Sequence, residues 1–437
     1  MDHLKRHCLI VALFFTNIIF ATALVNILPS FSYNPLPRQH PFEILLARAI
    51  SHKTSAATNS TSLTKLGGYN TEPLSRTSST TPTITHASLI SCISYDPSIR
   101  TITVSCSSTR LSDVYNALND SNILAKKSPA GTWFLSANLV IAKGASFHID
   151  PTDTRWLKIN SKVENGSRES KIGPAYIIDV FGSLKINTVK ITSWDPTTNN
   201  YAITHGYRHR DIRQAGAPRP YLIVENGASG TTDITNSEIA YLGYEKGNIS
   251  GRGTDGLDYY GGDRSTLRGN NIHHQNFGFY SVGVGHIVIE NNLIHDDGHY
   301  GLDPHTGTHD MIIRNNTVYG NKGIGIICSL DCYNILIENN KVHDNAGSGI
   351  MFSRNMSSSL ARNNIVYNED NGIFISQSHN NQIYKNIVSN STQGINVGSG
   401  SASNKIYNNT IIRSSSHGIS VSTSDAAANT IYSNIVK

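Results

Sequence analysis

Six glycine-led segments recur at nearly even intervals along the last third of the chain, and two more precede them. They begin at Gly256, Gly278, Gly301, Gly325, Gly349, Gly372, Gly394 and Gly418. The steps between these glycines are 22, 23, 24, 24, 23, 22 and 24 residues. A period in the low twenties with one glycine-led strand per repeat indicates a β-solenoid of stacked coils, not pairs of helices.

The residue after each glycine is apolar, as an inward-facing column must be if the stacked coils share one core. A second, mostly apolar column follows two residues later, and the residues between alternate outward with the period of two that strands require. This pattern predicts an all-β fold, a right-handed single-stranded parallel β-helix. Five members of the first column are expected to stack inside it: Ile326, Ile350, Ile373, Ile395 and Ile419.

A second strand in each repeat is followed by an asparagine. These asparagines are Asn292, Asn316, Asn340, Asn364, Asn386 and Asn409. Asparagine tolerates left-handed backbone and can hydrogen-bond its own turn, so stacked copies would satisfy the backbone at each corner. The column is therefore expected to be structural.

The first part of the chain differs in character. Residues 1–28 have a basic start, an apolar run and the small-residue segment Ala21-Thr22-Ala23, which predicts an export signal. The apolar stretch is nearly long enough to span a bilayer, so an uncleaved membrane anchor through residues 8–28 is the alternative. Residues 29–88 are rich in Ser, Thr and Pro and are expected to be a disordered linker. An N-terminal strand element is expected over 89–130 and the β-helix catalytic domain over 131–437.

Four cysteines remain once Cys8 is assigned to the signal segment. Cys92 and Cys106 flank an expected hairpin, and Cys328 and Cys332 are four residues apart at a coil corner. An exported protein permits two disulfides, although Cys328 fits a buried thiol equally well because it lies in an apolar column.

The formal net charge is +5, which suits acidic partners but decides nothing alone. The sequence contains no P-loop, dinucleotide-binding fingerprint, RNA-binding motif or HExxH segment. We expect no nucleic-acid partner, no metal and no cofactor.

One repeat differs from the others because it contains residues suited to proton transfer. Its hexad is Tyr300-Gly301-Leu302-Asp303-Pro304-His305. Strand alternation points Asp303 and His305 outward on one face, and the preceding coils place Tyr280 and Asp258 beside Asp303. These groups are expected to form a polar column on the solvent face, where a base, a phenol and a carboxylate can carry out proton transfer.

The hexad resembles the YG(F/I)DPH motif of mannuronan C5-epimerases, which act on alginate. The resemblance extends to 239–244, to the opening strands over 131–145 and to 316–320, and it covers about residues 130–425. It implies a β-helix whose groove holds a linear polyuronate and that inverts C5, converting mannuronate to guluronate in an alginate-like polymer. Carried onto matching positions, His305 would be one acid/base, Tyr300 the partner on the opposite face, and Asp303 the group that orients or tunes them.

The chain departs from this family pattern at two positions. The periplasmic type reads DPHD where this chain has Thr306, and the family arginine one coil later aligns with Leu330. The group that neutralises the substrate carboxylate is therefore open. Arg354 is one candidate, and the others are Lys322, Arg264 and Arg268. With Tyr280 and Asp258, Arg354 and Lys322 are the expected substrate-binding residues.

Two other functions remain open on the sequence alone. A polyuronate lyase begins with the same proton abstraction, and a carbohydrate-binding solenoid without catalysis would need only the repeats. In each case the expected partner is an anionic polysaccharide, and the protein is expected to be an exported monomer that is periplasmic, cell-surface or extracellular.

Overall fold

The computed structural model describes residues 92–162, 175–203, 218–245, 254–421 and 428–437. The expected signal or anchor over 1–28 and the linker over 29–88 lie outside these residues. In the described part of the chain, no helix is long and apolar enough to cross a membrane.

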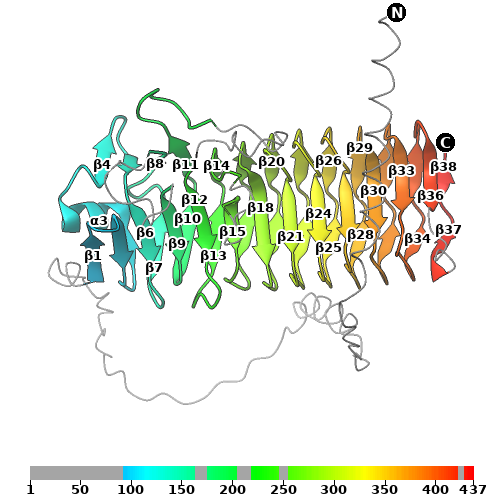
Figure 1. Ribbon diagram of the computed structural model, residues 1–437, viewed down its shortest axis with the longest axis horizontal. Helices are drawn as coiled ribbons and strands as arrows, with labels where there is room; N and C mark the ends of the chain where they lie inside the picture. Colours follow the sequence, from blue (N-terminus) through cyan, green and yellow to red (C-terminus); the bar gives the residue numbers. More distant parts are fainter. Residues whose placement is uncertain (1–91, 163–174, 204–217, 246–253, 422–427) are drawn as a thin grey trace, which may run out of the picture. The chain divides into compact units, whose positions relative to one another are not determined.

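Each coil contributes strands to three sheets that run the length of the stack (Figure 1). Sheet A contains β1 (Ile93–Asp96), β2 (Thr101–Val104), β6 (Asn138–Ile141), β9 (Ile177–Val180), β12 (Tyr221–Val224), β15 (Gly256–Tyr259), β18 (Phe277–Val282), β21 (Leu302–His305), β24 (Ile326–Ser329), β27 (Ile350–Ser353), β30 (Asn371–Ser376), β33 (Gln393–Val397) and β36 (His417–Val421). Sheet B contains β3 (Thr109–Arg110), β7 (Ser146–Ile149), β10 (Ser183–Asn187), β13 (Thr232–Thr235), β16 (Thr266–Arg268), β19 (Val288–Glu290), β22 (Ile312–Arg314), β25 (Leu336–Glu338), β28 (Leu360–Arg362), β31 (Gln382–Tyr384), β34 (Lys405–Tyr407) and β37 (Thr430–Tyr432). Sheet C contains β4 (Leu124–Lys127), β5 (Thr132–Leu135), β8 (Trp156–Asn160), β11 (Lys190–Trp194), β14 (Glu238–Ala240), β17 (Asn271–His273), β20 (Leu293–His295), β23 (Thr317–Tyr319), β26 (Lys341–His343), β29 (Ile365–Tyr367), β32 (Ile387–Ser389), β35 (Thr410–Ile412) and β38 (Ile435–Val436).

The fold is the predicted right-handed parallel β-helix. Pairing is parallel except between β1 and β2 and between β4 and β5, at the N-terminal end. The repeat pattern predicts two strands per repeat, whereas the structure has three. Strands of both sheet B and sheet C are mostly three residues long in the regular repeats. Those of sheet B show in the sequence as apolar runs such as Met311-Ile312-Ile313, whereas a strand of sheet C such as Thr317–Tyr319 has Val318 as its one buried residue.

The first apolar column stacks inside the coils as predicted. Ile326, Ile350, Ile373 and Ile395 are fully buried and pair in register from β24 to β33. The prediction is wrong in degree for Ile419, which is only partly buried. It lies on β36, the last strand of sheet A, so no further coil covers it.

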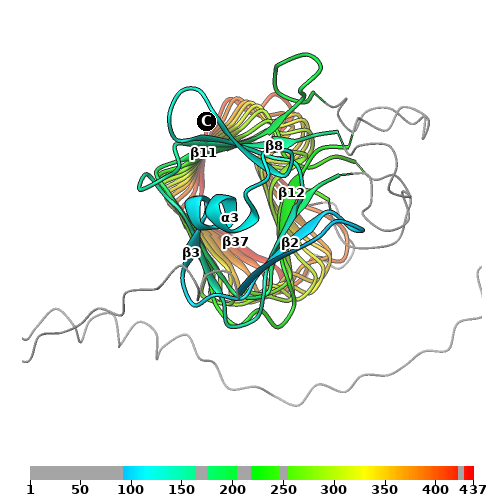
Figure 2. The ribbon, with the colours of Figure 1, turned by 90° about the vertical axis from the view of Figure 1, so that its left-hand side faces the viewer.

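The N-terminal end of the stack differs from the expected division at residue 131. Strands β2 and β3 already belong to sheets A and B, so the first coil begins within the segment 89–130. A helix that the sequence analysis did not foresee, α3 (Leu111–Leu118), lies across this end and buries Leu111 and Val114 in the core (Figure 2). It covers apolar side chains that no preceding coil could cover.

The expected cysteine pairs have different outcomes. Cys92 and Cys106 form a disulfide that ties the start of the described chain to the first coil. Cys328 and Cys332 are both free and buried. The second disulfide therefore does not form in this structure, and Cys328 is the buried thiol that was the alternative.

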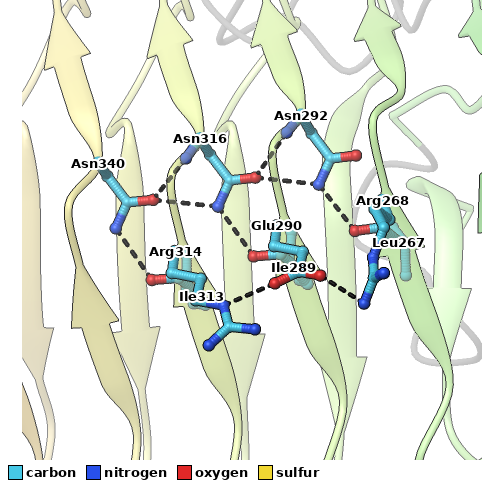
Figure 3. A network of polar contacts seen from close by, with 9 residues as sticks. All are labelled: Leu267, Arg268, Ile289, Glu290, Asn292, Ile313, Arg314, Asn316 and Asn340. Carbon is cyan, nitrogen blue, oxygen red and sulfur yellow. Dashed lines mark hydrogen bonds and ion pairs between the residues drawn. The ribbon is translucent and has the colours of Figure 1, made fainter. Parts of the chain in front are cut away.

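The asparagine column forms a hydrogen-bonded ladder along the stack (Figure 3). The Nδ2 of Asn316 donates to the Oδ1 of Asn340 at 3.0 Å and to the carbonyl of Ile289 at 2.9 Å. The left-handed residue is the one before each ladder position, such as Asn315 and Asn339, and not the ladder asparagine itself. The structural role of the column is thus confirmed, with the turn and the ladder divided between two neighbouring residues.

Candidate active site

The polar column on sheet A has the predicted register. Asp258 pairs with Tyr280 and Tyr280 pairs with Asp303, on the successive strands β15, β18 and β21. Neighbouring strands lie about 4.8 Å apart, so the three side chains form one row. The expectation that the row faces solvent is wrong for both carboxyls, because Asp258 is fully buried and Asp303 is 3% exposed. Tyr280 is half-buried.

A second acidic residue lies beside Asp258. The amide of Asp255 donates to the Oδ2 of Asp258 at 3.1 Å, and the Nδ2 of Asn276 donates to the Oδ1 of Asp255 at 3.2 Å. Burial raises the pKa of Asp255 to about 6. Burial and the neighbouring Asp255 carboxyl together raise the pKa of Asp258 well above its ordinary value. Two carboxyls this close cannot both ionise easily, so the pair retains a proton near neutral pH.

Asp303, in the middle of the hexad, is also a buried carboxyl whose protonated form is favoured by its surroundings. Burial and the charge of Asp255 raise its pKa, and the opposing effect of Arg354 is smaller. Its Oδ1 makes no hydrogen bond within the described residues. A buried carboxyl that lacks a hydrogen-bond partner is costly to keep, and such groups concentrate at functional sites.

His305 and Arg354 meet at the C-terminal end of the hexad strand. The Nη2 of Arg354 lies 3.0 Å from the Nε2 of His305, and the Arg354 Nε donates to the Oγ of Ser329 at 3.0 Å. The Nδ1 of His305 lies 2.5 Å from the Oγ1 of Thr306. Burial and the positive charge of Arg354 lower the pKa of His305, so the imidazole is neutral at pH 7 and its Nε2 accepts the hydrogen bond from Arg354.

An aromatic row extends from His305 along the same face. The ring of Tyr280 lies 5.6 Å from that of His305 and 5.9 Å from that of Phe277. Phe277 in turn contacts Tyr300 edge-on at 5.4 Å, and Tyr300 stacks on His299 at 3.7 Å. Tyr300 and His305 therefore stand at opposite ends of this row, and Tyr280 is the tyrosine that the structure brings against His305.

The remaining predicted residues are dispersed. Lys322 is exposed in the connection between β23 and β24. Arg268 forms an ion pair with Glu290 on sheet B, a different face of the coil (Figure 3). Arg264 is exposed in the turn before β16. Among these four basic candidates, Arg354 is the one for which the described residues show a contact with the hexad.

Three residues near the site were not anticipated: Asp255, Phe277 and Ser329. Ser329 pairs with His305 in register one coil later. A search of the sequence for partners 24 residues from His305 would have found it. Phe277 and Asp255 lie where strands begin, and alternation does not predict side-chain directions there.

The other histidines of the repeats form a stacked ladder on sheet C. His273, His295 and His343 stack in line with Tyr319 and Tyr367, with ring centroids 4.6–5.1 Å apart. Two of these histidines also bond the aspartate that follows them, Asp296 or Asp344. Within the described ranges, no three His, Cys, Asp or Glu side chains are grouped to hold a metal ion.

We expect replacement of Arg354 by glutamine to raise the pKa of His305, because the substitution removes a positive charge and leaves the burial in place. The lowered pKa keeps His305 neutral to lower pH than an ordinary histidine, and the variant should lose its neutral form at higher pH. NMR titration of the His305 ring, assigned by comparison with His305→Ala, measures this directly. An unchanged pKa would contradict the contact between the two side chains.

These features define a β-helix with buried carboxyls of raised pKa, a row of aromatic rings and a histidine–arginine pair beside sheet A. The family model described as periplasmic copper-binding protein (NosD) matches residues 221–398 and 364–437, together just under half of the chain. No curated protein matches the sequence.

Solved structures share the fold. The periplasmic alginate epimerase AlgG has a TM-score of 0.64 and 22% identity, over 77% of this chain and 85% of that one. The Dettilon tailspike protein has a TM-score of 0.50 and 15% identity, and the match covers 69% of this chain and 61% of the tailspike chain. The Azotobacter vinelandii mannuronan C-5 epimerase AlgE4 A-module has a TM-score of 0.47 and 17% identity, and the match covers 70% of this chain and 85% of the module. At these identities the likenesses to AlgG and to the tailspike protein show the fold alone.

Proposed function

We propose that this protein is a polysaccharide C5-epimerase that inverts uronate residues, converting mannuronate to guluronate in an alginate-like polymer. The observation that carries the proposal is the pair of His305 and Arg354, a neutral base and a cation that share one hydrogen bond. The resemblance of the hexad to the mannuronan C5-epimerase motif and the fold shared with AlgG support the same reaction.

The shared hydrogen bond suggests how substrate would activate the base. In the free protein, Arg354 covers the Nε2 lone pair of His305. A uronate carboxylate offers the guanidinium a stronger, charge-assisted and bidentate partner than an imidazole nitrogen. Once Arg354 turns to the carboxylate, the Nε2 of His305 is free to take the C5 proton. Arg354 then also stabilises the negative charge that develops on the carboxylate as the proton leaves.

Inversion requires a proton from the opposite face of the sugar. Tyr300 occupies the family position for this role, and Tyr280 is a second candidate because its ring lies 5.6 Å from that of His305. Burial and nearby acidic groups raise the pKa of Tyr280, so its phenol is protonated at neutral pH and would donate only to a strongly basic acceptor such as the C5 carbanion. The phenolate left after donation would regain a proton between turnovers.

The raised pKa values of the buried carboxyls suit a polyanionic substrate. Asp303 and the Asp255–Asp258 pair would repel a polyuronate if all three were ionised, and their raised pKa values avoid this. An acidic polysaccharide is accordingly the proposed partner. Residues 1–28 and the periplasmic relatives support export, with the protein acting outside the cytoplasm.

A carbohydrate-binding role without catalysis is the second candidate. The departure from the family pattern at Leu330, where the family has an arginine, favours it. A lyase would share the first step and then eliminate the 4-linked sugar.

Incubation with polymannuronate in deuterated water separates these outcomes. We expect deuterium at C5 together with inverted residues, both read by NMR. Unsaturated chain ends would identify a lyase instead. Binding with no exchange at C5 would contradict the epimerase proposal and leave the binding role. His305→Ala is the matched control, because the exchange must depend on the proposed base.

A further inference from the structure

A cavity of about 360 Å³ opens on sheet C near the N-terminal end of the stack. It is lined by strands β4, β5, β8 and β11 and by the turn after β11. Figure 2 shows β8 and β11 on a different side of the coil from β12, which belongs to sheet A. The cavity is therefore separate from the candidate active site.

The cavity carries unbalanced positive charge. Lys127 and Lys158 line it, and neither forms an ion pair with a described residue. Two nearby lysines are balanced, Lys190 by Glu238 at 2.7 Å and Lys162 by Asp195 at 3.2 Å. Burial and the charge of Lys190 lower the pKa of Lys158, which means that the charged ammonium is destabilised in the free protein. A bound anion would stabilise it.

Aromatic rings hold the ammonium of Lys158 in place. Its Nζ lies 3.3 Å from the ring centre of Trp194 and 4.0 Å from that of Trp156. The two indoles meet edge-on at 5.4 Å, and Tyr201 packs edge-on against Trp194 at 5.7 Å. The cation is thus positioned before any ligand arrives, which reduces the entropy lost on binding.

The lining points to one class of ligand. The ammonium groups of Lys127 and Lys158 suit a carboxylate, and the polar side chains of Ser128 and Asn199 suit hydroxyl groups. Phe134 and the edge of Trp194 supply apolar surface for the carbons of a sugar ring. A flat nucleobase is disfavoured, because Lys158 and Tyr201 already occupy the surroundings of the Trp194 ring. The volume lies at the lower end of the range of small-ligand sites, which suits one or two sugar units.

We propose that this cavity is a second saccharide-binding site, which takes a uronate unit through Lys127 and Lys158. The ligand class follows from the cavity alone. That the uronate belongs to the polymer processed on sheet A rests on the proposed function, and such a site would hold one part of a long chain while another part lies at His305. Two weak contacts on one polymer bind more tightly together than either does alone.

Tryptophan fluorescence offers a direct readout. The chain contains three tryptophans, Trp133, Trp156 and Trp194, all in the N-terminal coils, and two of them contact Lys158. Titration of the full chain with a mannuronate tetrasaccharide should change the emission in a saturable way. Lys158→Met and Lys127→Met should each weaken the apparent affinity about tenfold or more, the loss typical of a hydrogen bond to a charged group. Lys185→Met, at an exposed lysine on β10 of sheet B, should not.

Further controls separate binding in this cavity from turnover at the candidate active site. His305→Ala should retain the fluorescence response even if it lacks turnover, and a response in a catalytically inactive wild-type protein would still support the cavity. A neutral mannose tetrasaccharide and acetate at the same concentration should give no saturable change. The proposal is overturned if the mannuronate response is absent, if either control ligand reproduces it, or if it survives both lysine substitutions in variants with wild-type circular dichroism.

Discussion

Replacing His305 with alanine should lower turnover on a uronate polymer by about 10²–10⁴-fold, the usual contribution of a positioned acid/base. The imidazole is the neutral base of the site, and alanine leaves no group that could take a proton at that position. Binding of the polymer and the fold should change little, because His305 is half-buried at the surface end of β21 and is not part of the core. Initial rates with polymannuronate, compared with binding measured by calorimetry, test both parts.

Matched variants give this prediction its specificity. His343→Ala removes a histidine from the stacked ladder of sheet C and should leave turnover close to that of the wild type. Tyr300→Phe and Tyr280→Phe each remove one phenol and retain the ring, so the variant with the larger loss identifies the proton donor. Full turnover in His305→Ala would refute the mechanism, whatever the tyrosine variants show.

The repeat made most of the fold predictable. A ladder residue such as Ile350 repeats at a fixed interval, and its burial follows from the stacking of identical coils. The N-terminal end was less predictable, because the residues of α3 belong to no repeat and their role as a cover depends on the three-dimensional end of the stack. The third strand of each coil was not predicted because its single buried residue, such as Val318, stands alone and not in an apolar run such as Met311-Ile312-Ile313 of sheet B.

For the candidate site, the sequence predicted the strand register correctly but not the surroundings of the side chains. Alternation placed Asp303 beside Tyr280 correctly, since it depends only on backbone geometry. It could not show that Asp303 is buried, because alternation predicts the direction of a side chain and not what covers it. The contact between Arg354 and His305 joins residues 49 positions apart and depends on the left-handed backbone at Arg354. Sequence spacing made Arg354 a candidate, and only the fold showed what it touches.

Replacing Ile373 with aspartate should destabilise the β-helix by about 4 kcal/mol or more. Ile373 is fully buried between Ile350 and Ile395 in the central ladder, so the variant loses the packing of a large apolar side chain and buries a carboxyl with no partner. Because each coil contacts only its neighbours, the loss should appear first as unfolding of the coils around β30. Urea denaturation followed by circular dichroism measures the free energy of unfolding. Hydrogen exchange shows which coils unfold first.

The matched control for that prediction is Ile365→Asp. Ile365 lies on β29 in the preceding coil and is 45% exposed, so the same substitution there should change the free energy of unfolding by no more than about 0.5 kcal/mol. The contrast between two isoleucines eight positions apart isolates burial from residue type. Equal destabilisation by the two substitutions would mean that Ile373 does not face the core, and the inward ladder would have to be reassigned.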